Sequence, residues 1–179
     1  MEANTSVRDE LTGLYNWEYF HEKIKSEVDL SNRHSKPYSI VRFDIDNFKD
    51  INTNFGFEFG NLIIQQVADL CVNTTRGSDI VARQNAEEFV VMLPGISLDD
   101  SFVFAERVRS MIENNEYFGN DENQIRITVS MGIVTYVRKE GMDVTQMLQL
   151  LDTAVYQAKQ NGRNCIVPYT SFMPQEDFI

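Results

Sequence analysis

The stretch Arg83-Gln-Asn-Ala-Glu-Glu-Phe-Val-Val-Met-Leu93 places two adjacent acids at a turn signal between two short apolar runs. Before the turn, Asp79-Ile-Val-Ala-Arg83 alternates in the manner of a strand. After it, Phe89–Leu93 is a β-branched and aromatic run that ends at a Pro-Gly pair. The sequence therefore predicts a β-hairpin with Glu87 and Glu88 near its tip, where acids are candidate metal ligands.

A second pair of acids ends the strand-like run Ser39-Ile-Val-Arg-Phe-Asp-Ile-Asp46. Asp44 and Asp46 are spaced by one residue, so both project from the same face of a strand. If Asp44 meets Glu87, like charges about 4 Å apart repel by roughly 4 kcal/mol at an effective dielectric of about 20. A cation or a proton must then hold them together, and oxygen ligands favour magnesium or manganese.

Composition limits the possible partners. The chain has 179 residues, 42% of them hydrophobic, and we expect one domain over residues 1–168 with a linker or truncated tail over residues 169–179. The net charge of −11 excludes a general nucleic-acid or anionic-membrane surface and favours a small anionic ligand. Cys71 and Cys165 are too few for a disulfide framework, and no apolar run approaches the roughly 18 residues of a membrane span. We expect a cytoplasmic domain, whose parent protein can still be membrane-attached.

Apolar spacing predicts helices that alternate with strands. The helices are expected over residues 14–28, 48–54, 60–72, 98–112 and 144–158, and three strands besides the hairpin over residues 38–43, 125–136 and 165–168. This order describes an α/β (α+β) domain with a mixed sheet flanked by helices.

Three motifs resemble those of the GGDEF family of diguanylate cyclases, in the same order and over nearly the whole chain. Asp9-Glu-Leu-Thr-Gly-Leu-Tyr-Asn16 resembles the family's Asp-x-Leu-Thr-Gly-Leu-x-Asn, and Phe43-Asp-Ile-Asp-Asn-Phe-Lys-Asp-Ile-Asn52 resembles its Asp-x-Asp-x-Phe-Lys-x-x-Asn. Ala154–Asn164 is similar to its closing Ala-x-Tyr-x-Ala-Lys-x-x-Gly-Arg-Asn. The resemblance implies a palm-like nucleotide-cyclase fold with a central five-stranded mixed sheet. It also implies that two protomers each bring one GTP, and that the two are joined as cyclic di-GMP.

The resemblance further implies roles for single residues. Asp44, the backbone carbonyl of Ile45 and Glu87 would hold two Mg²⁺ or Mn²⁺ ions, and Glu88 would act as a further ligand or as proton acceptor. The implied nucleotide-binding residues are Asn47, Phe48, Lys49, Asn52, Asn61, Lys159 and Arg163. The cations among them would cradle phosphates.

A separate motif resembles the family's inhibitory site for cyclic di-GMP. Arg76-Gly-Ser-Asp79 matches the Arg-x-x-Asp of that site, and Arg107 matches its secondary arginine. Simpler interpretations stand beside all these roles. An Arg-x-x-Asp is also a common surface ion pair, the three phosphate-site cations also fit a solvated surface, Phe48 also fits the core, and Asp46 fits a structural or capping acid.

The hairpin turn departs from the family, because Asn85-Ala86 stands where the family has Gly-Gly. Asn tolerates a left-handed backbone, whereas Ala86 would be strained at positive φ by about 1–2 kcal/mol and puts a methyl group where the nucleotide approaches. Asn61 stands where the family usually has an Asp that accepts from guanine, and Phe57 where it usually has His. The amide would cost about 1–3 kcal/mol, or roughly 10- to 100-fold in affinity.

Three functions remain open from the sequence. A degenerate GGDEF module that binds GTP or cyclic di-GMP and regulates an attached domain is the first expectation. An active Mg²⁺-dependent diguanylate cyclase, which requires a homodimer, is the second, and a dimerisation scaffold without a ligand is the third. We expect no nucleic-acid partner. We expect an upstream sensor, and the tail Val167–Met173 is similar to linkers that lead to an EAL-type phosphodiesterase domain, which makes a downstream fusion a further option.

Overall fold

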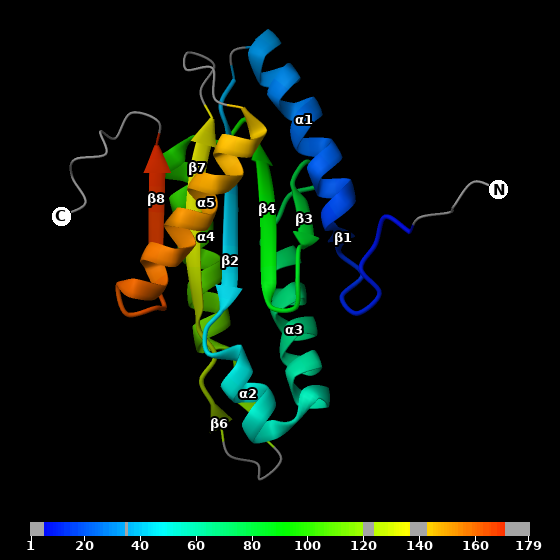
Figure 1. The fold of residues 1–179 in the computed structure, drawn as a ribbon, viewed down its shortest axis with the longest axis vertical. Coiled ribbons are helices and arrows are strands. Elements are labelled where there is room, and N and C mark those ends of the chain that lie inside the picture. The colour runs from blue at the N-terminus through cyan, green and yellow to red at the C-terminus, as the bar shows by residue number, and fades with distance from the viewer. Residues whose placement is uncertain (1–5, 35, 120–123, 137–142, 171–179) are drawn as a thin grey trace.

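The computed structural model describes residues 6–34, 36–119, 124–136 and 143–170 as a mixed sheet with helices on both faces (Figure 1). The helices are α1 (Trp17–His34), α2 (Phe48–Phe55), α3 (Phe57–Val72), α4 (Leu98–Asn114) and α5 (Val144–Gln160). The strands of the main sheet are β1 (Tyr15–Asn16), β2 (Tyr38–Ile45), β3 (Ile80–Arg83), β4 (Glu88–Pro94), β7 (Val129–Tyr136) and β8 (Ile166–Thr170). A separate small sheet pairs β5 (Tyr117–Phe118) with β6 (Gln124–Ile125).

The main sheet has the strand order β1-β3-β4-β2-β7-β8. β2 is antiparallel to both of its neighbours, whereas β1 and β8 pair in parallel with β3 and β7. The expected mixed sheet flanked by helices is confirmed, with six strands in place of the expected five. The additional strand is β1, which has only two residues and therefore no periodic pattern that could indicate it.

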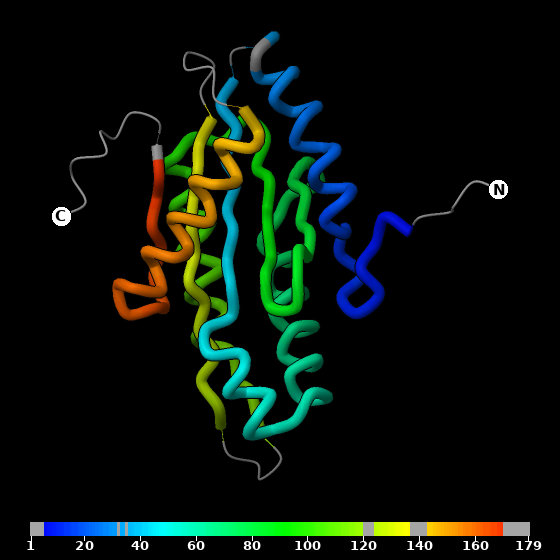
Figure 2. The backbone as a smooth tube through the Cα atoms, in the orientation of Figure 1, coloured from blue at the N-terminus to red at the C-terminus, as the bar shows by residue number. Residues whose placement is uncertain are grey.

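β2 lies at the centre of the sheet, and all eight of its residues are buried. In register, Tyr38 at one end lies opposite Pro94, and Asp44 near the other end lies opposite Glu88. The tip of the β3–β4 hairpin therefore lies at the same end of the sheet as the C-terminal end of β2, as the backbone trace in Figure 2 shows.

The two faces of β2 belong to different cores. Val41, Phe43 and Ile45 pack with side chains of α3 and α4, whereas Tyr38 and Ile40 pack with side chains of α1 and α5. Figure 1 shows α1 and α5 in front of the sheet and α3 and α4 behind it. Because helices cover both faces of β2, water cannot solvate a charged side chain on this strand. Each charge on β2 therefore needs a partner inside the protein.

Several helix and strand boundaries differ from the expected ones. α1 begins at Trp17, because the side-chain oxygen of Asn16 accepts from the N–H of Tyr19 at 3.0 Å and so caps the helix. The same helix continues to His34, beyond the expected end. The expected strand over residues 125–136 is divided into β6 and β7.

Two expectations from composition concern thiols and membranes. Both cysteines are free, and burial raises the pKa of the Cys71 thiol to about 12. That thiol is therefore an inert part of the core. Within the described ranges, no helix is long and apolar enough to cross a bilayer.

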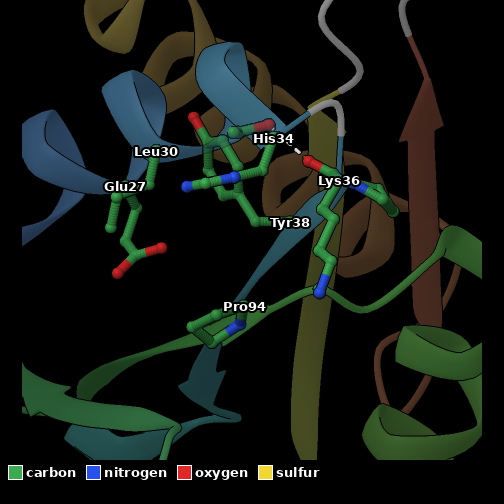
Figure 3. A pocket seen from close by; sticks show the side chains of 9 residues that line it. Glu27, Leu30, His34, Lys36, Tyr38 and Pro94 are labelled. Carbon is green, nitrogen blue, oxygen red and sulfur yellow. Dashed lines mark hydrogen bonds between the residues drawn. The ribbon is translucent and has the colours of Figure 1, made fainter.

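The end of the sheet remote from Asp44 contains a cavity of about 280 Å³, between the C-terminal end of α1 and the start of β2 (Figure 3). Leu30, Tyr38 and Pro94 line it. The Tyr38 hydroxyl donates to the sulfur of Met147 at 2.9 Å. In the described part of the chain, no buried unpaired polar side-chain atom belongs to its lining, so we assign it no ligand.

An ionic cluster connects α4 with the turn after α5. Arg109 donates to the side-chain oxygen of Asn164 at 2.7 Å and to the carboxylate of Glu113 at 2.6 Å. Glu113 also accepts from Arg126 and, at 2.9 Å, from the side-chain amide of Asn164. Hydrogen bonds from Arg126 and Arg109 lower the pKa of Glu113 from 4.5 to about 2.

Gly132 of β7 tests how closely α5 packs on the sheet. A Cβ at this position would lie 2.8 Å from Cβ of Ala154 and 3.1 Å from the carbonyl of Leu151. We expect Gly132→Ala to lower the free energy of unfolding by about 1–3 kcal/mol in urea titrations. Gly77→Ala is the matched control, since nothing lies within 4 Å of its added Cβ. Equal stability of the two variants would contradict the packing.

Glu113→Gln tests the ionic cluster by its pH dependence. Because the folded-state pKa lies below the unfolded value, the ionised carboxylate stabilises the fold above pH 4.5, and this contribution is lost as the pH falls toward about 2. We expect the free energy of unfolding in urea to fall more steeply over this window in the native protein than in Glu113→Gln. Parallel curves would show that the carboxylate is not held by the two arginines.

Candidate functional site

Three elements bring charged side chains to one end of the sheet. Asp44 lies near the end of β2 and pairs in register with Glu88, the first residue of β4. The N–H of Ile45 donates to the carbonyl of Glu87 at 3.2 Å, which ties the hairpin tip to the end of β2. Lys159 comes from the C-terminal part of α5, which lies at the same end (Figure 1). These contacts bring the strand acid and both hairpin acids to the same end of the sheet.

The Asp44 carboxylate is buried, with 6% of the residue exposed. Its Oδ2 atom lies 2.9 Å from Nζ of Lys159. Burial raises the pKa of Asp44, the Lys159 ammonium opposes the rise, and the negative charges of Glu87 and Glu88 add to it. The ionised carboxylate thus depends on a cation, a place that Lys159 takes in this structure.

Arg42 belongs to the same group, although the sequence reasoning did not single it out. It is 8% exposed, its guanidinium lies 3.6 Å from the Glu88 carboxylate, and it forms an ion pair with Asp152 of α5. Burial lowers the pKa of Arg42, and the charges of Glu88 and Asp44 oppose this. A signal was present in the sequence, because Arg42 precedes Asp44 by two positions and strand alternation puts both on one face.

The hairpin turn is held by Arg83 and by the Asn85 side chain. Arg83 donates to the carbonyls of Asn85 and Ala86 at 3.2 and 3.0 Å, and it pairs with the Asp9 carboxylate at 3.2 Å. The Asn85 amide donates to Oε2 of Glu88 at 2.7 Å, a bond that glycine at this position lacks. Ala86 does not have a positive φ, so the backbone strain expected at this residue is absent.

A cavity of about 390 Å³ lies between the turn and α2. Its lining consists of Phe48, Lys49, Asn52, Thr53, Phe57, Ala86 and Glu87. The side-chain oxygen of Asn52 is buried and has no hydrogen-bond partner, which costs free energy unless a ligand or water supplies a donor. Gly60 makes room for this oxygen, because a Cβ there would lie 1.9 Å from it. Phe57 is 78% exposed at this cavity.

The other predicted nucleotide ligands differ in how they relate to this cavity. Phe48 belongs both to the core and to the cavity wall. Asn47 precedes α2 in the left-handed conformation, with φ of 54°. Arg163 is exposed on the turn after α5 and is left-handed as well, with φ of 65°. Asn61 is exposed on α3 and does not belong to the cavity lining.

Asp46 is a structural acid, as the sequence indicated. Its carboxylate accepts from the hydroxyls of Thr128 and Ser130 at 2.7 and 2.6 Å, and from the N–H of Asn164 at 3.1 Å. These bonds join the end of β2 to β7 and to the turn after α5. Asp46 therefore supports the site without facing its cavity.

The oxygen atoms at this end of the sheet suit a hard divalent cation in kind, since Asp44 and Glu87 offer carboxylates and Ile45 a carbonyl. Among the residues that the structure describes, no three His, Cys, Asp or Glu side chains are gathered as a metal-binding group. The carboxylates would need the carbonyl and oxygen atoms of a phosphate ligand to complete a coordination shell. Magnesium is often bound in this way, by one or two carboxylates together with substrate phosphates.

A second cavity, of about 260 Å³, brings together the three residues of the predicted inhibitory site. Arg76, Asp79 and Arg107 all line it, and Thr74 and Phe104 contribute to its wall. The Asp79 carboxylate accepts from the N–H of Arg76 at 2.8 Å, and Arg107 donates to the carbonyl of Thr74 at 3.0 Å. Two guanidinium groups and one carboxylate therefore line the same hollow.

Comparisons with known proteins identify the family and the fold of this chain. The family model described as "Diguanylate cyclase, GGDEF domain" matches residues 6–165. Response regulator PleD of Caulobacter vibrioides is 34% identical over 163 residues, which cover 90% of this chain and 36% of PleD. Diguanylate cyclase SiaD of Pseudomonas aeruginosa, solved in complex with its activator SiaC, superposes with a TM-score of 0.86 at 29% identity, over 92% of this chain and 62% of SiaD.

The fold alone is also shared with a solved domain of lower identity. The GGDEF domain of DgcB from Caulobacter crescentus, solved in complex with c-di-GMP, superposes with a TM-score of 0.87 at 22% identity, over 94% of this chain and 98% of that domain. Because the chain spans only 36% of the length of PleD, the likeness concerns this domain and not the whole relative. The family match takes in all three sequence motifs and the hairpin, and this chain therefore belongs to the GGDEF domain family of diguanylate cyclases, the family of cyclic di-GMP signalling.

Proposed function

We propose that this domain binds GTP in the cavity beside Glu87 and cyclic di-GMP in the cavity beside Arg76, and that it acts chiefly as a regulatory module of a larger protein. The observation that carries the first part is the buried, unpaired side-chain oxygen of Asn52 in the cavity lining. The edge of guanine carries N–H donors, and one of them would supply the hydrogen bond that this oxygen lacks once the amide turns from Gly60 toward the cavity.

The charges in the cavity beside Glu87 and at the same end of the sheet suit a triphosphate. Cations are available from three elements, namely Lys49, Lys159 and Arg163. Asp44, the carbonyl of Ile45 and Glu87 would hold Mg²⁺ or Mn²⁺, which neutralises the phosphates and activates the ribose 3′-hydroxyl when bound. Lys159 would then leave Asp44 and meet a phosphate.

Weak turnover is the consequence we infer from the altered turn. The Ala86 methyl lines the same cavity as Glu87 and reduces the space beside the nucleotide. The Asn85 amide and the Arg42 guanidinium both engage Glu88, the proposed proton acceptor. Each 1.36 kcal/mol added to the barrier lowers the rate about tenfold, so a small displacement of the reacting groups reduces turnover by orders of magnitude.

The second cavity suits cyclic di-GMP because its charges match the ligand. A guanidinium such as that of Arg76 or Arg107 can form paired hydrogen bonds with a phosphate or a guanine edge. Asp79 can accept from the guanine N–H donors. This ligand would occupy a pocket beside α4, apart from the acids at the end of β2.

An active Mg²⁺-dependent diguanylate cyclase is the second candidate function. The position of Asp44 opposite Glu88, with Glu87 next to it in the hairpin and Lys159 paired with Asp44, favours it. Joining two GTP molecules would require two such sites to face each other in a homodimer.

We also propose the setting of the domain from its sequence. The domain would lie within residues 1–168, between an upstream sensor and a linker that can lead to an EAL-type phosphodiesterase. β8 continues to Thr170, so the first two residues of that linker pair with β7.

Two substitutions separate the proposed ligands. We expect isothermal titration to show GTP with Mg²⁺ bound at least tenfold more weakly by Asp44→Asn, with the affinity for cyclic di-GMP unchanged. Arg76→Ala should do the opposite, with a loss of about 10- to 100-fold for cyclic di-GMP, because a hydrogen bond to a charged group contributes about 1.5–3 kcal/mol. Each variant is the control for the other. If the native protein bound neither ligand, a scaffold role would remain.

Restoring the turn and the base contact tests the inferred loss of turnover. We expect the double variant Ala86→Gly with Asn61→Asp, dimerised and incubated with GTP and Mn²⁺, to form cyclic di-GMP at least tenfold faster than the native protein, as measured by mass spectrometry. The reasons are the removed methyl group and a second acceptor for guanine, which would come from α3 one helical turn after Phe57 of the cavity lining. A native rate already equal to that of the double variant would favour the active cyclase.

A further inference from the structure

The turn that carries Arg163 has an uncommon backbone. Gly162, Arg163 and Asn164 are left-handed in succession, with φ of 102°, 65° and 46°. Residues with a side chain adopt this conformation rarely, and a structure keeps them there only when surrounding contacts hold them. Two backbone contacts are present, from the N–H of Arg163 to the carbonyl of Ala158 at 3.0 Å and from the N–H of Asn164 to Asp46 at 3.1 Å.

The side chain of Asn164 is fixed at both of its polar ends by α4. Its oxygen accepts from Arg109 at 2.7 Å, and its amide donates to Glu113 at 2.9 Å. Arg109 is itself held between Glu106 and Glu113, each at 2.6 Å, and its side chain is 15% exposed. A guanidinium with two carboxylate partners has little freedom to move, so it offers the turn a fixed point of attachment.

This attachment crosses from one layer of the fold to the other. α4 packs on the sheet face opposite α5, yet it holds the turn that follows α5. The same turn is joined to the end of β2 through Asp46. Arg163 therefore leaves the backbone from a turn that is anchored both to the acid-bearing strand and to α4.

We propose that Arg109 is a positioning residue for the nucleotide site. Through Asn164 it fixes the left-handed turn, and with it the direction in which the Arg163 side chain leaves the backbone. The inference rests on the proposed function, in which Arg163 binds a phosphate. Arg109 lines neither the cavity beside Glu87 nor the one beside Arg76, so it acts through Asn164 and not on the nucleotide itself.

Hydrogen exchange in the ligand-free protein tests the attachment directly. In Arg109→Met and Asn164→Ala we expect the amides of Arg163 and Asn164 to exchange at least tenfold faster than in the native protein, while the β2 amides remain protected. Glu106→Ala is the matched control, since it removes one partner of Arg109 and leaves the bond to Asn164. Unchanged protection at the turn in Arg109→Met would overturn the proposal, whatever Asn164→Ala shows.

A double-mutant cycle tests the effect on the nucleotide. We expect Arg109→Met to weaken the binding of GTP with Mg²⁺ about tenfold in the native background and to cause no further loss in the Arg163→Ala background. Equal losses in both backgrounds would overturn positioning through Arg163. If the native protein bound no GTP, the proposed function would fail, and the exchange rates would still decide whether Arg109 fixes the turn.

Discussion

The end of the sheet that carries the site is governed by Asp44, an acid one residue before the end of a strand whose two faces are both covered. Asp44 cannot be solvated there, and burial together with two neighbouring glutamates disfavours its charge. Lys159 balances the charge of Asp44 in an ion pair at 2.9 Å, and Arg42 pairs with the adjacent Glu88. Both contacts tie β2 and β4 to α5, directly or through Asp152.

Such pairs are weak sources of stability, because the desolvation of two charges can exceed their attraction. Their presence at this end of the sheet is better explained by the proposed binding of a metal ion and a phosphate. In the proposed function, a divalent ion would replace Lys159 at the Asp44 carboxylate, and the released ammonium would meet a phosphate of the nucleotide. The acids and their cations thus form one unit, because the charge of each acid is balanced by a cation of the same group.

The altered hairpin turn changes this unit through side chains and not through backbone strain. Ala86 is unstrained, and its methyl group occupies cavity wall beside Glu87. Asn85 adds a hydrogen bond to Glu88 that a glycine could not make. Both effects act at the turn that carries Glu87 and Glu88, and neither Asn85 nor Ala86 has a positive φ. α4 contributes to two places in the fold, because Arg107 lines the cavity beside Arg76 and Arg109 donates to Asn164 in the turn after α5.

Strand alternation and turn residues are local signals, and they were enough to predict the mixed sheet, the hairpin and the acids near its tip. The sequence also indicated that Asp46 is structural and that Arg76, Asp79 and Arg107 belong together. The side-chain contacts of the charged residues became known only from the packed structure. No local pattern could show that Lys159 would lie on Asp44, that Arg42 would be a buried cation, or that Asn164 would be held from α4. Such contacts join residues far apart in the chain, and their strength depends on burial, which exists only once the layers have packed.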